Sequence, residues 1–149
     1  MRCAILELAV LAIDHFIVTA QIMENKIKGR LNGIGPVQFK KKLDQGRAPY
    51  ILDVRTPEEF HMMRLGIGET LIPIGELRRR LNDLPSDKER EIVCYCKISL
   101  RGYEAAILLQ AEGWNNVKVL EGGVMAWPYR RGNSALIRTY SCIACFSLQ

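Results

Sequence analysis

The chain has 149 residues, which is enough for one domain with a core of its own. Its hydrophobic fraction of 48% and charged fraction of 25% are those of an ordinary globular protein. The formal net charge of +5 is modest and no basic run is interleaved with aromatic residues, so the sequence does not indicate a nucleic-acid partner. A mild positive balance suits small anionic substrates.

The chain has five cysteines, and their odd number and uneven spacing do not indicate a disulfide framework. Free thiols persist in a reducing compartment, so we predict a cytoplasmic protein. The cysteines are Cys3, Cys94, Cys96, Cys142 and Cys145.

Residues 3–24 predict one helix that is apolar on most of its sides. Such a helix must be buried against something, which suggests self-association into a homo-oligomer or a missing partner. Its longest unbroken apolar run, residues 8–13, is far shorter than the roughly 18 residues of a membrane span, so we expect no membrane partner. A signal peptide is the alternative, because residues 18–20 resemble a cleavage site, but charged residues interrupt the apolar region.

The next segment, residues 29–35, predicts a linker or a short edge strand. Pro36 then predicts a helix start, with Gly46 as the stop. The residues expected to face inward from this helix are Val37, Phe39 and Leu43.

Residues 50–54 predict a buried strand that leads into a helix. Thr56 is the expected N-cap and Pro57 the first helical residue, followed by two glutamates that suit the positive helix end. Asp53 and Arg55, at the end of the strand, are expected to tie it to neighbouring loops.

Two more helices are predicted from the apolar spacing. One covers residues 76–84, with Leu77, Leu81 and Leu84 facing inward and three arginines facing water. After a strand over residues 117–120 and a glycine pair, residues 125–127 are expected to begin a short last helix that packs as core.

The most informative stretch, residues 91–106, predicts a strand, a tight loop and a helix. Residues 92–95 are a short apolar run typical of a parallel sheet, and the small apolar residues after Gly102 have helical spacing. Cys96 falls where the strand ends, and Arg101 falls where the helix begins.

This placement predicts a reactive thiol. A helix N-terminus carries partial positive charge and unpaired N–H groups, so Cys96, with Lys97 and Arg101 nearby, should ionise more easily than an ordinary cysteine. The same donors can hold an anion. From the residues alone, the alternative is a buried cysteine that merely ends a strand.

Three motifs resemble the rhodanese-type sulfurtransferase domain. Cys96, four residues, Arg101 and then Gly102-Tyr103 resemble its active-site loop. Residues 52–60, which contain Asp-Val-Arg and Glu-Phe, and residues 120–127, which contain Gly-Gly and Ala-Trp, resemble its flanking motifs.

The resemblance implies an α/β fold with a central parallel sheet and helices on both faces, to which this chain adds an N-terminal helix. It divides the chain into a helix and linker (1–29), a rhodanese domain (30–131) and a C-terminal tail of unknown role (132–149).

The resemblance also implies the site. Cys96 would receive sulfur as a persulfide from a small anionic donor, thiosulfate or a persulfide, and pass it to a thiol or cyanide acceptor. Asp53, with Arg55, would support the wall of the site, and no metal or cofactor is implied. The substrate-binding loop would consist of Lys97, Ile98, Ser99, Leu100 and Arg101.

The sequence departs from the family pattern at two positions. Leu65 stands where the family usually has a histidine, which is not the nucleophile, so activity is not excluded. Ser99 stands where the family often has glycine, and a serine is disfavoured if the loop needs a positive φ. These departures leave a second interpretation open, a binding or regulatory module of a disulfide or persulfide reductase system.

Residues 17–29 resemble the helix that closes the oxidoreductase part of flavin-dependent disulfide reductases, such as coenzyme A-disulfide reductase, which carry a C-terminal rhodanese domain. This resemblance implies that a flavin reductase module is a partner, with flavin and coenzyme A bound mostly outside this chain.

The cysteines and the loop also allow other interpretations. Cys94, Cys96, Cys142 and Cys145 form two pairs that could hold zinc, although their spacing is unlike common zinc sites. Cys94 lies about 6–7 Å behind Cys96 in an extended strand, which is long for a resolving disulfide. A cysteine–loop–arginine site also occurs in phosphatases, but those resembling families use five intervening residues where this chain has four.

Overall fold

The computed structural model describes residues 17, 20, 22–29 and 31–132. The chain divides into two compact units, Met1–Asn32 and Gly33–Gln149. In the first unit residues 22–27 are helical and a turn follows at residues 28–29. Most of the predicted helix over residues 3–24 lies outside the described residues, so its expected role in oligomer formation stays a prediction. Cys142 and Cys145 also lie outside the described residues. Within the described part of the chain, no helix has the length and apolar character needed to span a membrane.

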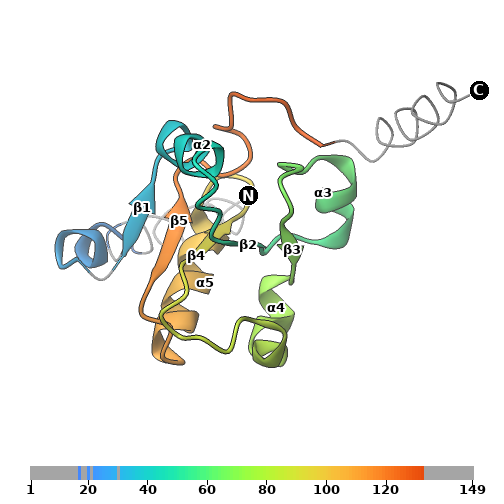
Figure 1. Ribbon diagram of the computed structural model, residues 1–149. Helices are drawn as coiled ribbons and strands as arrows, with labels where there is room; N and C mark the ends of the chain where they lie inside the picture. The colour runs from blue at the N-terminus through green and yellow to red at the C-terminus, as the bar shows by residue number, and fades with distance from the viewer. Residues whose placement is uncertain (1–16, 18–19, 21, 30, 133–149) are drawn as a thin grey trace, which may run out of the picture. The chain divides into compact units, whose positions relative to one another are not determined.

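A five-stranded sheet in the order β1-β5-β4-β2-β3 forms the centre of the fold (Figure 1). The pairs β2–β3, β2–β4 and β4–β5 are all parallel, which confirms the predicted α/β class with a parallel sheet. The strands are β1 (Asn32–Ile34), β2 (Tyr50–Asp53), β3 (Thr70–Leu71), β4 (Ile92–Tyr95) and β5 (Val117–Leu120).

Strand β4 occupies the middle of the sheet and is buried along its whole length. Cys94 pairs with Leu52 of β2 on one side and with Val119 of β5 on the other. A strand with neighbours on both edges and helices over both faces must be apolar throughout, which explains the unbroken apolar run that precedes Cys96.

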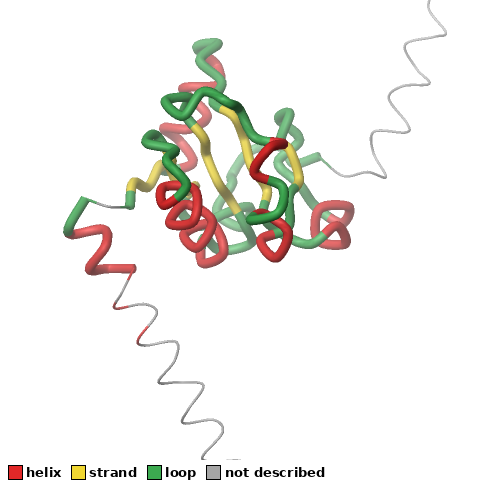
Figure 2. Tube along the Cα trace, turned by 90° about the horizontal axis from the view of Figure 1, so that it is seen from below, coloured by secondary structure: helices red, strands yellow, loops and turns green. Residues whose placement is uncertain are grey.

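Helices cover the strand layer on both sides (Figure 2). On one side Phe39 of α2 packs edge-to-face on Trp127, and both belong to the core cluster that contains Val93 and Tyr95 of β4. On the other side α5 packs along β4 and β5. The helices are α2 (Pro36–Asp44), α3 (Pro57–Met62), α4 (Ile74–Leu77) and α5 (Leu100–Ala111), with a 3-10 turn at Leu81–Asp83.

Local signals placed the start of α3 correctly. The Thr56 hydroxyl accepts the Glu59 amide and the Glu59 carboxylate accepts the Thr56 amide, so the two form a capping box. Pro57 occupies the first turn, as its fixed φ favours.

The predicted helix over residues 76–84 is wrong. The chain instead forms α4, which begins directly after Pro73, and then the separate 3-10 turn. The break falls at Arg80, which has φ −113° and ψ 25°, and Leu84 is extended before Pro85, as a residue before proline prefers to be. Leu77 and Leu84 are nevertheless buried, so the apolar spacing found the core positions but not the helix.

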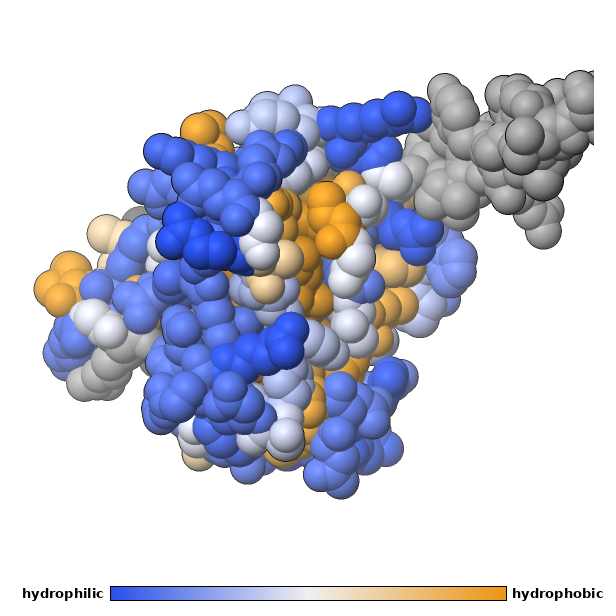
Figure 3. Space-filling model, viewed as in Figure 1, coloured by the Kyte–Doolittle hydropathy of each residue, from blue (hydrophilic) through white to orange (hydrophobic). Residues whose placement is uncertain are grey.

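The predicted last helix at residues 125–127 is also wrong, because residues 121–126 form turns. Trp127 is core as expected, but Met125 is 49% exposed. Val37 of α2, expected to face inward, is 66% exposed, while Phe39 is buried. Figure 3 shows that the face viewed in Figure 1 is mostly hydrophilic, with an apolar strip exposed near its middle.

Candidate active site

The predicted site lies at the carboxyl ends of the parallel strands. From the centre of the sheet, β2 leads to β3 at one edge, whereas β4 leads to β5 towards the other. The loops that follow β2 and β4 therefore diverge, and in open α/β sheets ligands bind where loops diverge in this way. Cys96 follows β4 directly, and Asp53 ends β2.

Cys96 is held at the start of a tight loop that leads into α5. Its residue is 1% exposed, and the backbone amide of Ser99 donates a hydrogen bond to Sγ at 3.2 Å. Ser99 has φ 99°, so the loop does require the left-handed conformation that a serine disfavours. The Ser99 amide is thus an N–H donor directed at the sulfur, as expected for a cysteine placed just before a helix start.

The turn after β5 is bonded to this loop along the backbone. The amide of Val124 donates to the carbonyl of Cys96 at 2.9 Å, and the amide of Met125 donates to that of Lys97 at 3.2 Å. Gly123 makes this approach possible, because a Cβ there would lie 2.3 Å from the Cys96 carbonyl oxygen. These amides serve the cysteine loop. Pro128 follows Trp127 directly and disfavours helical conformation at the residue before it, so the turn does not continue as the expected helix.

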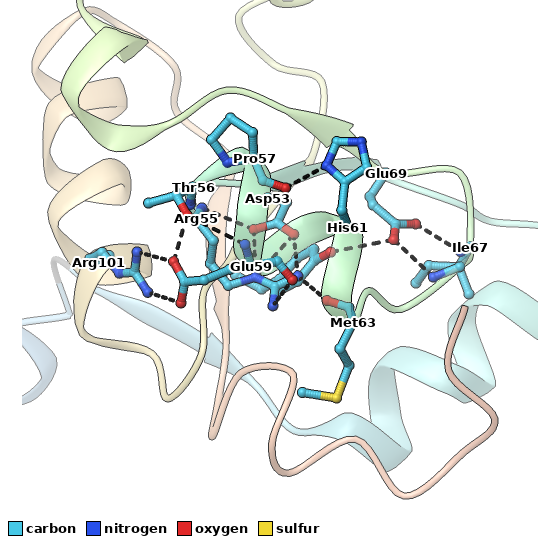
Figure 4. Close-up of polar contacts among 12 residues, drawn as sticks. Asp53, Arg55, Thr56, Pro57, Glu59, His61, Met63, Ile67, Glu69 and Arg101 are labelled. Atoms are coloured by element: carbon cyan, nitrogen blue, oxygen red, sulfur yellow. Dashed lines mark hydrogen bonds and ion pairs between the residues drawn. The ribbon is translucent and has the colours of Figure 1, made fainter. Parts of the chain in front are cut away.

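Arg101, at the start of α5, pairs with Glu59 of α3 (Figure 4). Its two terminal nitrogens each donate to one carboxylate oxygen of Glu59, both at 2.7 Å. The hydrogen bond from Arg101 lowers the pKa of Glu59 to about 2. The pKa of Arg101 is raised, first by its hydrogen bond to Glu59 and to a smaller extent by Cys96.

Asp53 and Arg55 form a buried ion pair next to Glu59 and Arg101 (Figure 4). Arg55 Nη2 donates to Asp53 Oδ2 at 2.6 Å and also to the carbonyl of Met63 at 2.7 Å. A longer bond, 3.4 Å, runs from Arg55 Nη1 to the carbonyl of Glu59. The pair therefore joins the end of β2 to both ends of the α3 segment, and its charges are compensated within the fold.

The remaining predicted loop residues lie at the surface or close to it. Lys97 and Ile98 are exposed and Leu100 is half-buried. Leu65, at the position of the family's usual histidine, is 1% exposed and packs in the core cluster.

Cys94 is separated from this chemistry by burial. Its side chain is completely buried, and burial raises the pKa of its thiol. Cys94 and Cys96 are both free thiols. No group of three or more metal-binding side chains occurs within residues 17–132 as far as these are described, and the zinc interpretation depends on Cys142 and Cys145, which lie outside them.

Sequence reasoning missed Glu59 as part of the site. It assigned this glutamate only to the first-turn dipole of α3. The capping box was the available signal. It fixes Glu59 in the first turn of α3, and α3, like the helix that carries Arg101, begins at the carboxyl ends of the strands. The contacts of the Ser99 hydroxyl with the turn after β5 were missed too, since nothing local predicts them.

Comparison with known proteins identifies the family. The family model for the Rhodanese-like domain matches residues 35–128. The chain belongs to the rhodanese-like family. This match spans strands β2 to β5, the cysteine loop and the turn after β5, and it confirms the family that the three motifs indicated.

Two curated relatives show how the rhodanese-like domain is used elsewhere. The probable adenylyltransferase/sulfurtransferase MoeZ of Mycobacterium tuberculosis is 35% identical over 98 residues, which cover 63% of this chain but only 24% of MoeZ. A sulfurtransferase of Allochromatium vinosum is 31% identical over 101 residues, covering 65% of this chain and 88% of that protein. The family and these relatives support a sulfurtransferase-type function.

Two similar solved structures come from larger reductases. Reduced Bacillus anthracis CoADR-RHD has a TM-score of 0.62 and 31% identity, over 70% of this chain and 18% of that one. The NAD-dependent persulfide reductase from A. fulgidus has a TM-score of 0.58 and 39% identity, over 74% of this chain and 18% of that one. The rhodanese-like domain of this chain thus resembles domains that belong to reductase systems.

Proposed function

We propose that this chain is a sulfurtransferase whose nucleophile is Cys96. The observation that carries the proposal is the hydrogen bond from the Ser99 amide to Cys96 Sγ, at 3.2 Å, at the carboxyl end of the central strand. An N–H donor stabilises a sulfur anion more than a neutral thiol, and the thiolate is the reactive form. Arg101 lies at the start of the helix that follows the same loop, and its guanidinium is held there by Glu59.

The reaction proceeds in two displacements. The Cys96 thiolate attacks the outer sulfur of thiosulfate, the S–S bond of the donor breaks, and sulfite leaves with the electron pair. Cys96 is then a persulfide. A thiolate or cyanide attacks its outer sulfur, and the Cys96 thiolate leaves and is restored, so the cycle needs no net electrons.

The burial of Cys96 favours small donors. A residue that is 1% exposed meets only the tip of a molecule, and the terminal sulfur of thiosulfate or of a persulfide is such a tip. The loop amide and Arg101 hold the negative charge of the donor and of the departing group. A whole phosphoryl group, with three oxygens around its centre, fits this narrow loop less well.

The resemblance to reductase domains extends the proposal to partners. We assign the physiological donor to a persulfide supplied by a reductase module, the flavin-dependent disulfide reductase that residues 17–29 suggest, because one similar structure is an NAD-dependent persulfide reductase. The acceptor is then a thiol, which requires a reducing compartment such as the cytoplasm.

A thiosulfate:cyanide sulfurtransferase assay tests the proposal. Cys96→Ser should abolish thiocyanate formation, while the matched variant Cys94→Ala, two residues earlier in the chain, should retain it. Mass spectrometry of wild type after thiosulfate should show one added sulfur that a reductant removes. Transfer that survives Cys96→Ser would exclude Cys96 from the mechanism.

The burial of Cys96 also favours a second candidate, a binding or regulatory module with no turnover. In that case wild type and Cys96→Ser would be equally inactive, and no persulfide would form with thiosulfate or with a low-molecular-weight persulfide. Measured turnover in the wild type alone would exclude this candidate.

A further inference from the structure

Ser99 is unusual in its backbone conformation. Among the residues that the structure describes, it alone combines a side chain with a positive φ, and the other residues with positive φ are glycines. A serine with φ 99° is strained, because its Cβ crowds the neighbouring backbone. Strain of this kind persists only where surrounding interactions hold it, and it is frequent at functional sites.

The Ser99 hydroxyl supplies those interactions. Oγ donates to the carbonyl of Leu120 at 3.2 Å and accepts the amide of Gly122 at 2.7 Å. Both partners belong to the end of β5 and the turn that follows it. The residue is 6% exposed, so water does not compete strongly for these bonds.

The backbone of Ser99 is committed as well. Its amide donates to Cys96 Sγ at 3.2 Å, and its carbonyl accepts the amide of Tyr103 at 2.9 Å within the first turn of α5. One residue therefore links three parts of the site: the sulfur, the helix start and the turn after β5. A change in its φ would rotate the amide away from the sulfur.

We propose that Ser99 is a positioning residue whose hydroxyl anchors the cysteine loop to the turn after β5 and thereby keeps its own amide directed at the Cys96 sulfur. A glycine would reach the same φ without strain but would leave the loop unanchored. The serine accepts the strain and is held by two side-chain bonds. This proposal deepens the proposed function, on which it rests for the role of Cys96 as sulfur carrier.

Two substitutions separate the two contributions of Ser99. Ser99→Gly removes the anchor but tolerates the positive φ, whereas Ser99→Ala removes the anchor and keeps the strain. The loop of the alanine variant should relax to negative φ and lose the bond to sulfur. Ser86→Ala, at an exposed serine, is the matched control.

The primary readout is the reactivity of Cys96, which does not depend on sulfur transfer. Each variant is labelled with iodoacetamide across a range of pH and digested with trypsin. Cys94 and Cys96 lie in one peptide, residues 91–97, so fragmentation compares the two thiols directly and the buried Cys94 serves as an internal reference. Thermal unfolding and thiosulfate:cyanide transfer are measured on the same samples.

For Ser99→Ala we expect Cys96 labelling at neutral pH to slow by about tenfold, as the loss of one hydrogen bond to the reactive thiolate predicts. Ser99→Gly should be intermediate, at about threefold slower. Ser86→Ala should match wild type. The order wild type, glycine, alanine would support the anchoring role.

Several results would overturn the proposal. One is a folded Ser99→Ala protein whose labelling profile equals that of wild type, since the residue would then be merely structural. Another is a Ser99→Gly protein that labels faster than wild type, since the anchor would then be unnecessary. A wild-type Cys96 that labels no faster than Cys94 would also overturn it.

The two readouts keep this proposal separate from the sulfurtransferase assignment. If wild type transfers no sulfur but the Ser99 variants shift the labelling of Cys96, the positioning role stands and the proposed function fails. If wild type transfers sulfur and Ser99→Ala does so equally well with an unchanged profile, the function stands and the positioning role fails.

Discussion

The pair between Glu59 and Arg101 yields a quantitative prediction for Glu59→Gln. The ordinary pKa of a glutamate is 4.5, and Arg101 lowers that of Glu59 to about 2. A difference of that size corresponds to roughly 3 kcal/mol as an upper bound. The two side chains are 30% and 24% exposed, so solvent screening reduces the contribution to about 1–2 kcal/mol. Glutamine keeps one oxygen for the Thr56 amide but presents an NH2 group in place of the other, so the loss combines the charge with one of the two hydrogen bonds from Arg101.

The sign of the pH dependence follows from the depressed pKa. The contribution is fully present above the unfolded pKa near 4.5 and is lost as the pH falls through the folded value of about 2. At pH 3 more than half of it should already be gone. The difference in stability between wild type and Glu59→Gln should therefore shrink as the solution is acidified.

Urea unfolding of both proteins at pH 7 and pH 3 measures this difference. At pH 7 the variant should be less stable by about 1–2 kcal/mol, which lowers the melting temperature by roughly 5–15 °C for a domain near 100 residues. Glu76→Gln, which removes an exposed partner of Arg80, is the matched control and should change stability by less than about 0.5 kcal/mol. Equal stability of wild type and Glu59→Gln at pH 7, or an undiminished difference at pH 3, would refute the reasoning.

Two further substitutions test the parts that hold the site. Gly123→Ala should lower the free energy of unfolding by about 3 kcal/mol or more and abolish sulfur transfer, because the new Cβ would lie 2.3 Å from the carbonyl oxygen of Cys96. Gly46 has a similar φ but open space around it, so Gly46→Ala should lower the free energy of unfolding in urea by only about 1 kcal/mol. Arg55→Met leaves a buried carboxylate without its partner and should cost about 3–5 kcal/mol, whereas Arg80→Met, at an exposed arginine, should change the unfolding free energy by less than about 1 kcal/mol; similar losses for the two would contradict the buried-pair argument.

The sequence predicted those parts of the fold that depend on local signals. The apolar run of residues 92–95 predicted the central strand, and the helical spacing that begins just after Cys96 predicted the place of this cysteine at the strand end. The N-cap Thr56, followed by Pro57, predicted the start of α3. The sequence also indicated that a serine at position 99 is disfavoured if the loop needs a positive φ, and the structure does place Ser99 at positive φ.

Predictions failed where distant partners decide the backbone. The amides of Val124 and Met125 donate to the cysteine loop, some 28 residues earlier in the chain, and these contacts fix the turn at residues 121–126. The bidentate pair of Glu59 with Arg101 joins residues 42 positions apart. The spacing of apolar residues along the sequence carries no information on contacts between residues so far apart. It also failed at residues 76–84, where a proline on each side favours a shorter helix and a turn.

The bonds between the cysteine loop and the turn after β5 bear on how this domain can change its chemistry. Inserting one residue after Cys96, to admit a bulkier oxyanion, would displace Lys97 and Ser99 from their partners at the end of β5 and in the turn that follows it. Such an insertion needs a compensating change around Gly122 and Gly123 to restore the hydrogen bonds between the cysteine loop and the turn after β5. A laboratory selection for a new substrate should therefore succeed with libraries that vary both segments together and fail with libraries confined to either one.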